Sequence, residues 1–257
     1  MNTQPQRVDL WKRISAWLFD LILLACMVIV FALLLSWILG YDAHYQKLEQ
    51  TYQKYADTYQ VDRNMTQQTY DAMSQEQKDA YNARVEAADK AMDQDAQAKK
   101  AYTMVVNLTL VIASVSVLLG IVLMEFAIPL LFKNGQTLGK KAFGIALVRN
   151  DSVKITTLQL FMRTVLGKYA VETMIPVYLL ILLFLGSAGA VDILLIGVIL
   201  LVQVLCPLFT YNRQGLHDLM AGTAAVDIAT QRIFSSPDEL VEYIKQVHAE
   251  RAVDQSY

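Results

Sequence analysis

Four stretches of the chain are long and apolar enough to cross a membrane, and they constrain the fold more than any other feature. A spanning α-helix needs about 20 mostly apolar residues. The four stretches cover residues 14–39, 102–132, 166–185 and 193–211. We therefore predict an all-α membrane protein with four transmembrane helices, an extracytoplasmic helical hairpin and a small cytoplasmic β element.

The composition agrees with a membrane protein. Hydrophobic residues make up 55% of the 257 residues and charged residues only 18%, whereas a soluble domain carries about 25% charged residues. The first apolar stretch is too long for a cleavable signal and contains Asp20. Cys26 and Cys206 both lie in apolar stretches without a second cysteine nearby, which predicts neither a disulfide nor a metal site. We expect no cofactor and no nucleic-acid partner; the lipid bilayer is the expected surrounding.

The positively charged residues predict the orientation, because Lys and Arg concentrate in cytoplasmic loops. The segment 133–164 carries six basic residues and one acid, whereas 41–101 carries eight basic and eleven acidic residues. Four spans then leave both termini in the cytoplasm. We expect a multi-pass protein of a bacterial inner cell membrane.

The predicted organisation alternates spans with segments outside the membrane. A cytoplasmic stub with the first span is followed by the outer hairpin, the second span, a cytoplasmic β-hairpin with an amphipathic helix, a transmembrane hairpin, and a tail with a strand and an amphipathic helix. These segments are residues 1–40, 41–101, 102–132, 133–164, 165–212 and 213–257.

The outer segment has helical periodicity. Its tyrosines recur at spacings of 4, 7, 3 and 4, which places them on one helical face, and Ser74 with Gln77 forms a capping box. We predict helices over 42–62 and 74–101. The tyrosine stripe forms either the packing seam of this hairpin or a surface for a partner. The tyrosines are Tyr41, Tyr45, Tyr52, Tyr55 and Tyr59.

The segments at the other membrane face predict short strands and helix caps. Residues 142–149 alternate in polarity, and 153–156 could return beside them as a second strand. Thr156 is placed to cap a surface helix that precedes the third span. Residues 223–228 are a further candidate strand beside 142–149, and a tail helix begins near Pro237.

Charged residues within the spans require a physical explanation, because each costs several kcal/mol unless it is paired or hydrated. Asp20 and Glu125 each lie about 10 Å inside the cytoplasmic boundary on antiparallel helices. Further charged residues precede the first span, begin the third or follow the fourth. Those that we expect to be charge partners of the two acids are Arg13, Arg163, Lys168, Glu172 and Arg213, and His217 and Asp218 also follow the fourth span.

The cluster has two interpretations. It could be a buried network that fixes helix packing, with Asp20 paired to Arg163 or Arg213. Alternatively, Asp20 and Glu125 could bind a cation or share a proton, because two carboxylates in a low-dielectric space favour both. Arg13 and Arg163 would then tune their pKa, and Asp218 would hold an inner gate.

The chain resembles the RDD family of small bacterial membrane proteins over roughly 7–40 and 102–229. The resemblance rests on Arg13 at the start of the first helix, Asp20 midway along it, and Asp218 in the segment Asn-Arg-Gln-Gly-Leu-His-Asp, which includes His217. The segment that starts at Gly135 resembles the Gly-x-Thr-x-Gly-Lys pattern of the family. In that segment the other three matching residues are Thr137, Gly139 and Lys140. Its spacing is one residue short of a phosphate-binding loop. The resemblance implies transport of an unidentified ligand.

Two functions stay open on the sequence. The first is transport of a cation, a proton or a proton-coupled small solute, for which a homo-oligomer would give more room than four helices. The second is a non-transporting adaptor or scaffold that binds a protein partner through the outer hairpin or the tail helix. We do not expect an enzyme, because the sequence shows no nucleophile–base pair.

Overall fold

The computed structural model describes residues 5–132, 134–184, 186 and 188–254. It is 75% helical and contains four helices long and apolar enough to cross a membrane, together with a two-stranded sheet. These findings confirm the predicted fold class. The predicted transmembrane hairpin over 165–212 contains Leu185 and Ser187, which lie outside the described residues.

The chain divides into two compact units, which are described separately. The first unit comprises residues 1–29 and 117–257 and contains the sheet and the charged cluster. The second comprises residues 30–116. Helices α1 (Leu10–Ile38) and α5 (Ala96–Ile121) each contribute to both units.

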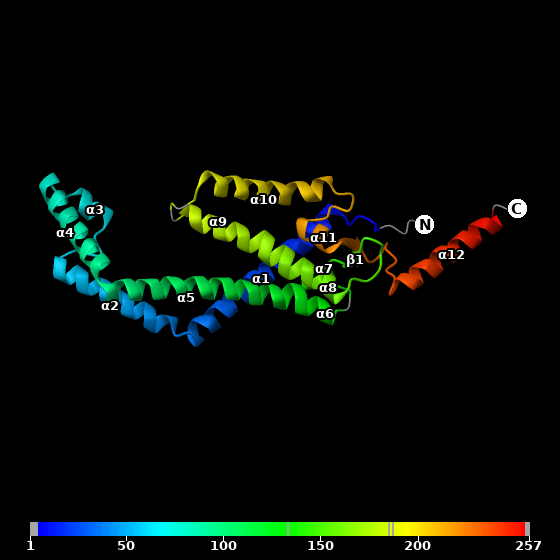
Figure 1. Ribbon diagram of the computed structural model, residues 1–257, viewed down its shortest axis with the longest axis horizontal. Helices are drawn as coiled ribbons and strands as arrows, with labels where there is room; N and C mark the ends of the chain where they lie inside the picture. The colour runs from blue at the N-terminus through cyan, green and yellow to red at the C-terminus, as the bar shows by residue number, and fades with distance from the viewer. Residues whose placement is uncertain (1–4, 133, 185, 187, 255–257) are drawn as a thin grey trace. The chain divides into compact units, whose positions relative to one another are not determined.

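Each candidate membrane-spanning helix begins before its apolar stretch in the sequence and ends one or two residues before the end of that stretch. They cover Leu10–Ile38, Ala96–Leu131, Thr157–Leu183 and Ala190–Phe209. The second continues from α5 through a π-helical segment, η1 (Val122–Ala127), into α6 (Ile128–Leu131). The fourth is α10. Figure 1 shows α10 returning beside α9 (Ile175–Phe184).

The predicted surface helix leads into the third span, and the structure joins the two in one continuous helix. Helix α8 (Thr157–Phe161) passes without a break into a π-helical segment, η2 (Met162–Met174), and then into α9. The capping box at Thr156 and Gln159 is present at the start of α8. Residues 157–165 are therefore the first turns of one long helix.

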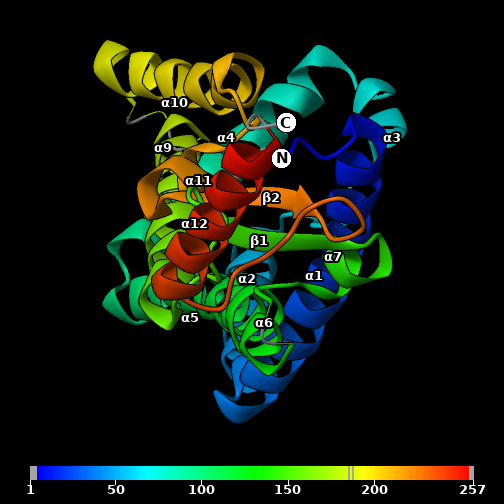
Figure 2. The ribbon, with the colours of Figure 1, turned by 90° about the vertical axis from the view of Figure 1, so that its right-hand side faces the viewer.

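Two strands form a small antiparallel sheet. Strand β1 (Ile145–Arg149) pairs with β2 (Thr223–Asp227), with Leu147 opposite Ala225, as Figure 2 shows. The predicted return strand at 153–156 is reduced to an isolated bridge between Val148 and Lys154. The residues that pair with β1 therefore come from the far end of the chain.

Short helices flank this sheet. Helix α7 (Leu138–Ala142) precedes β1, and α11 (Leu216–Ala221) precedes β2. The tail helix α12 (Pro237–Asp254) follows β2. At Gly139 the backbone of α7 approaches α1 so closely that a Cβ would clash with the carbonyl oxygen of Ala16. Glycine is therefore required for this approach.

The second unit contains the predicted helical hairpin, with α2 (Tyr41–Tyr59) beside α4 (Gln75–Gln94) and a short α3 (Gln67–Asp71) between them. The capping box at Ser74 and Gln77 is present. The helix predicted over 74–101 instead ends at Gln94. Asp95 breaks it because its carboxylate accepts hydrogen bonds from the backbone of Gln97 and Ala98 at the start of α5.

The tyrosine stripe contributes to contacts within the hairpin. Tyr41 stacks on Tyr45 with ring centroids 6.2 Å apart, and the Tyr55 hydroxyl donates to Asp95 over 2.8 Å. The first contact lies within α2, and the second joins α2 to the end of α4, as a packing seam would. Tyr45 remains exposed.

Replacing Gly139 with alanine is expected to destabilise the protein by about 1–3 kcal/mol, because the added methyl group overpacks the contact with α1. The matched control is Gly197→Ala in α10, where an added Cβ has no neighbour within 4 Å. Unfolding in detergent, followed by tryptophan fluorescence, measures both variants. Equal stability of the two variants would contradict the close approach of α7 to α1.

Candidate functional site

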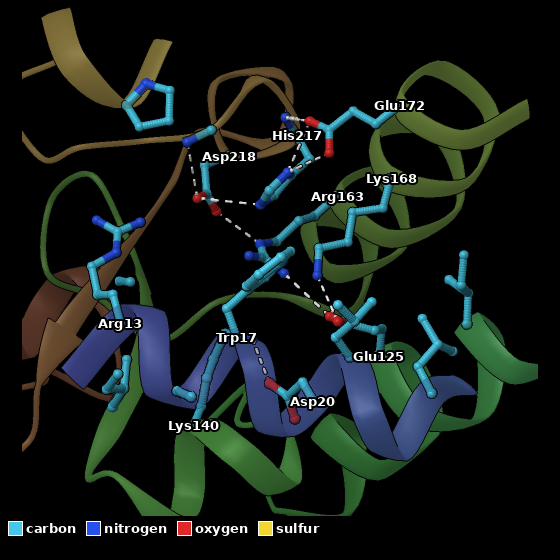
Figure 3. Close-up of a pocket in the computed structure, with 18 of the residues that line it drawn as sticks. Arg13, Trp17, Asp20, Glu125, Lys140, Arg163, Lys168, Glu172, His217 and Asp218 are labelled. Carbon is cyan, nitrogen blue, oxygen red and sulfur yellow. Dashed lines mark hydrogen bonds and ion pairs between the residues drawn. The ribbon is translucent and has the colours of Figure 1, made fainter. Parts of the chain in front are cut away.

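A cavity of about 450 Å³ in the first unit collects most of the charged residues of the spans. Figure 3 shows these side chains pointing toward one another from several elements. Apolar residues such as Trp17 and Leu24 of α1 and Pro207 of α10 complete its wall. The charged and titratable lining residues are Arg13, Asp20, Glu125, Lys140, Arg163, Lys168, Glu172, His217 and Asp218.

The π-helical geometry of η2 directs its charges into this cavity. Glu172 follows Arg163 by nine residues, which is about two and a half turns of an α-helix and would place them on opposite faces. A π-helix bonds residue i to residue i+5 and holds roughly 4.4 residues per turn, so nine residues make about two turns. Arg163, Lys168 and Glu172 therefore share one face, and all three line the cavity.

Glu125 projects from η1 and is paired with two bases of η2. Its Oε1 lies 2.6 Å from Lys168 Nζ, and its Oε2 lies 3.8 Å from Arg163 Nη1. The shorter contact is a charge-assisted hydrogen bond. The longer one is an ion pair only, and in the described part of the chain the buried atoms Glu125 Oε2 and Arg163 Nη1 have no hydrogen-bond partner. This pairing connects the second and third spans.

Arg163 also binds Asp218, which lies after the fourth span. Arg163 Nε donates to Asp218 Oδ1 over 2.8 Å, and both side chains are almost fully buried. The Thr223 hydroxyl donates to the same oxygen over 2.9 Å. Burial raises the pKa of Asp218, but the charges of Arg163 and His217 and their hydrogen bonds outweigh it and hold that pKa well below its usual range. Asp218 therefore stays ionised.

His217 lies between two carboxylates. Its Nδ1 is 2.9 Å from Glu172 Oε1, and its Nε2 is 3.4 Å from Asp218 Oδ2. Its backbone N–H also donates to Glu172. Gly167 permits this arrangement, because a Cβ there would lie 2.7 Å from His217 Cβ. Helix α11 can therefore approach η2 closely.

Asp20 anchors α7 to α1. Its Oδ1 accepts from the backbone N–H of Gly139 over 2.7 Å, and its Oδ2 accepts from the Thr137 hydroxyl. Lys140 Nζ lies 3.6 Å from the same Oδ2. The predicted pairing of Asp20 with Arg163 or Arg213 is wrong. Asp20 binds the start of α7, and Arg163 pairs with Glu125 and Asp218.

Lys140 is the basic residue closest to Asp20. Among the described residues its ammonium has one hydrogen bond, to the Thr137 hydroxyl over 3.1 Å. Burial lowers the pKa of Lys140 to about 8; the negative charges of Glu125 and Asp20 oppose this change, whereas Lys168 and Arg163 add to it. Lys140 therefore changes its charge near neutral pH.

Other predicted site residues lie at the cavity rim or outside the cavity. Arg13 lines the cavity and donates to the backbone oxygen of Asn212 over 3.0 Å. Arg213 does not line it, and it adopts a left-handed backbone conformation with φ of 52°. Gly135 also lies elsewhere: its φ is 62°, and it approaches Ile155 and Leu147. Gly135 therefore shapes the turn before α7.

Trp17 and Gln203 line the cavity but were not predicted as site residues. Trp17 lies one turn before Asp20 on α1, a spacing that places both on one face, and both line the cavity. Gln203 donates from α10 to the backbone oxygen of Glu172 over 3.3 Å. The sequence signal for Gln203 was its polar amide side chain in the middle of an apolar span.

The described residues contain no group of three or more His, Cys, Asp or Glu residues that could hold a metal ion. The carboxylates of the cavity are instead paired with fixed bases. Asp20 lies beside Lys140, Glu125 beside Lys168, Glu172 beside His217 and Asp218 beside Arg163.

Comparison with known proteins gives one family. The model of the RDD family matches residues 7–222, which is most of the chain. No curated protein and no solved structure matches the chain. The match includes both Arg13 and Asp218 and also spans the outer hairpin.

Replacing Asp218 with asparagine is expected to cost about 3–5 kcal/mol of stability, because it leaves the buried Arg163 without its closest countercharge. The control is Arg149→Gln, which removes a partly exposed ion pair with Asp151 and should cost less than about 1 kcal/mol. Unfolding in detergent micelles measures both. A loss for Asp218→Asn no larger than that of the control would contradict the buried pairing.

Proposed function

Because the chain belongs to the RDD family of membrane proteins, we propose that its charged cavity moves a proton, a small cation or a proton-coupled small solute across the membrane. The observation that carries this proposal is a polar cavity within a membrane protein. Ionisable residues are costly there, and they commonly mark the path of an ion or a substrate. Asp20 and Glu125 are the proposed acidic residues of this path.

The buried atoms without hydrogen-bond partners support occupancy of the cavity. Glu125 Oε2 and Arg163 Nη1 line the region between the second and third spans, and neither has a partner among the described residues. A buried charged group without a hydrogen bond costs free energy. Water or a polar solute that enters the cavity after a small side-chain movement could satisfy both atoms.

The existing ion pairs favour a proton or a proton-coupled solute over a bare metal cation. Each cavity carboxylate has a basic group within 4 Å. A metal cation would have to displace one of these bases, whereas a proton can be exchanged by a base that stays in place. Proton-coupled movement is therefore the form of transport that we propose.

We further propose that the protein lies in a bacterial inner membrane with both termini and the charged cavity toward the cytoplasm. The excess of basic residues in 133–164 supports this orientation. The role is that of a non-enzymatic carrier.

A second copy of the chain could complete the path. None of the described residues of α10 is buried, so one side of the fourth span is free to contact lipid or another subunit. Four helices give a narrow bundle, and we propose that a homo-oligomer would give the path more room.

The alternative function is an adaptor that binds a protein through the outer hairpin or the tail helix. The exposed ring of Tyr45 in the outer hairpin and the exposed side chain of Val241 in the tail helix favour this role. The contacts of Tyr41 and Tyr55 within the hairpin weigh against the tyrosine stripe as the binding surface.

The transport proposal predicts proton flux in liposomes that contain the purified protein and an internal pH-sensitive dye. Imposing a pH difference, with Na⁺ or K⁺ on either side, should give a dye response that Glu125→Gln reduces at least tenfold. The physical reason is that the variant leaves Lys168 without its closest carboxylate. Asp20→Asn should reduce the flux similarly, because it weakens the anchor of α7.

The control is Glu49→Gln in the outer hairpin, which removes an exposed ion pair with Arg63 and should leave the flux unchanged. Gel filtration and circular dichroism establish that each variant is folded. Absence of flux in the unaltered protein under all these gradients would contradict transport. Co-purification of a protein that depends on residues 42–100 would then support the adaptor.

A further inference from the structure

Four lysine and arginine residues line the cavity. Two of them have no hydrogen bond to a carboxylate among the described residues. Lys168 donates to Glu125 and Arg163 donates to Asp218. Arg13 donates to a backbone oxygen and Lys140 to a hydroxyl. An arginine does not lose its proton in proteins. Of the two weakly partnered bases, Lys140 alone can therefore release a proton.

The position of Lys140 links it to two spans. It is carried by α7, which α1 holds through Asp20, and its ammonium lies 3.6 Å from Asp20 Oδ2. The charged groups that face it are Asp20 from α1, Glu125 from η1, and Lys168 and Arg163 from η2. A change in its charge therefore acts on three of the four spanning helices at once.

The cavity carboxylates are poorly suited to release and take up the proton themselves. Asp20 accepts two hydrogen bonds at the start of α7, and Glu125 accepts a charge-assisted hydrogen bond from Lys168. Each such bond stabilises the ionised carboxylate. Protonation of either acid would break contacts that hold two elements together, whereas deprotonation of Lys140 weakens only one ion pair and one hydrogen bond.

We propose that Lys140 is the proton-exchanging group of the cavity, and that Asp20 and Glu125 position it and stabilise its charged form. This inference rests on the proposed proton-coupled transport. In each cycle the ammonium of Lys140 gives its proton to water in the cavity, leaving a neutral amine, and the amine later takes up a proton. The lowered pKa of Lys140, about 8, agrees with exchange near neutral pH.

Competitive labelling with acetic anhydride tests the exchange without a transport assay, because only the neutral amine reacts. The full-length protein in liposomes is labelled across pH 6–11, and mass spectrometry reads each lysine. Lys140 should reach half its maximal reactivity near pH 8, the pH at which half of its amine is neutral. Lys141, the exposed neighbour in the sequence, is the internal reference for reagent hydrolysis and digestion.

The variant Glu125→Gln gives the sign of the electrostatic effect. The charge of Glu125 favours the protonated form of Lys140, so its removal should shift the labelling curve of Lys140 to lower pH. The curve of Lys141 should not move. If the Lys140 amine of the unaltered protein stays unreactive up to pH 10, the proposal is overturned.

A second readout is proton flux in the liposomes that contain a pH-sensitive dye. Lys140→Arg keeps the positive charge but cannot release its proton, so flux should fall at least tenfold. Lys141→Arg is the matched control and should keep the flux of the unaltered protein. Flux retained in Lys140→Arg but lost in His217→Gln would assign the exchange to His217 and overturn the proposal.

The two tests separate this inference from the proposed function. A Lys140 labelling curve centred near pH 8 without any flux would support a proton-exchanging lysine and contradict transport. Flux that is normal in Lys140→Arg would support transport and contradict the role of Lys140.

Discussion

The arrangement at this site depends on one constraint: charged groups inside a membrane protein must be paired or hydrated. Glu125 is therefore held against Lys168, and Arg163 against Asp218. These pairs join the second span to the third and the third to the segment after the fourth. Asp20 adds the first span through α7. The same contacts that neutralise the charges thus determine which elements meet around the cavity, so structure and proposed function share one set of residues.

The sequence predicted the four candidate spans and the helical outer hairpin. These features follow from length, periodicity and charge, which are local properties. The partners of the charges could not be predicted in the same way. Asp20 binds the start of α7 because glycine at position 139 permits a backbone approach that depends on tertiary packing. The sequence did offer 223–228 as a partner strand, and β2 does pair with β1, whereas the nearer return strand, which was also a candidate, forms only a bridge.

The π-helical segment η2 was the feature least accessible to sequence reasoning. With ordinary α-helical periodicity, Arg163 and Glu172 lie on opposite faces, and the third span shows too short an uncharged core. The wider turns bring both residues and Lys168 to the cavity. Lys168 follows Arg163 by five residues, and Glu172 follows Lys168 by four. These spacings fit the wider turns of a π-helix but are too weak a pattern to predict one. Departures from α-helical geometry of this kind are frequent at functional sites.

The most direct measurement of the central claim is the access of water to the cavity. In a protein with Cys26→Ser and Cys206→Ser, a single cysteine replaces either Gln203, which lines the cavity, or Val198, which is exposed on the same helix. A charged thiol reagent applied to liposomes should modify Gln203→Cys and stop proton flux, and should leave Val198→Cys unmodified within the lipid. Equal lack of reaction at both positions would mean that the cavity is a dry set of ion pairs and would contradict the account.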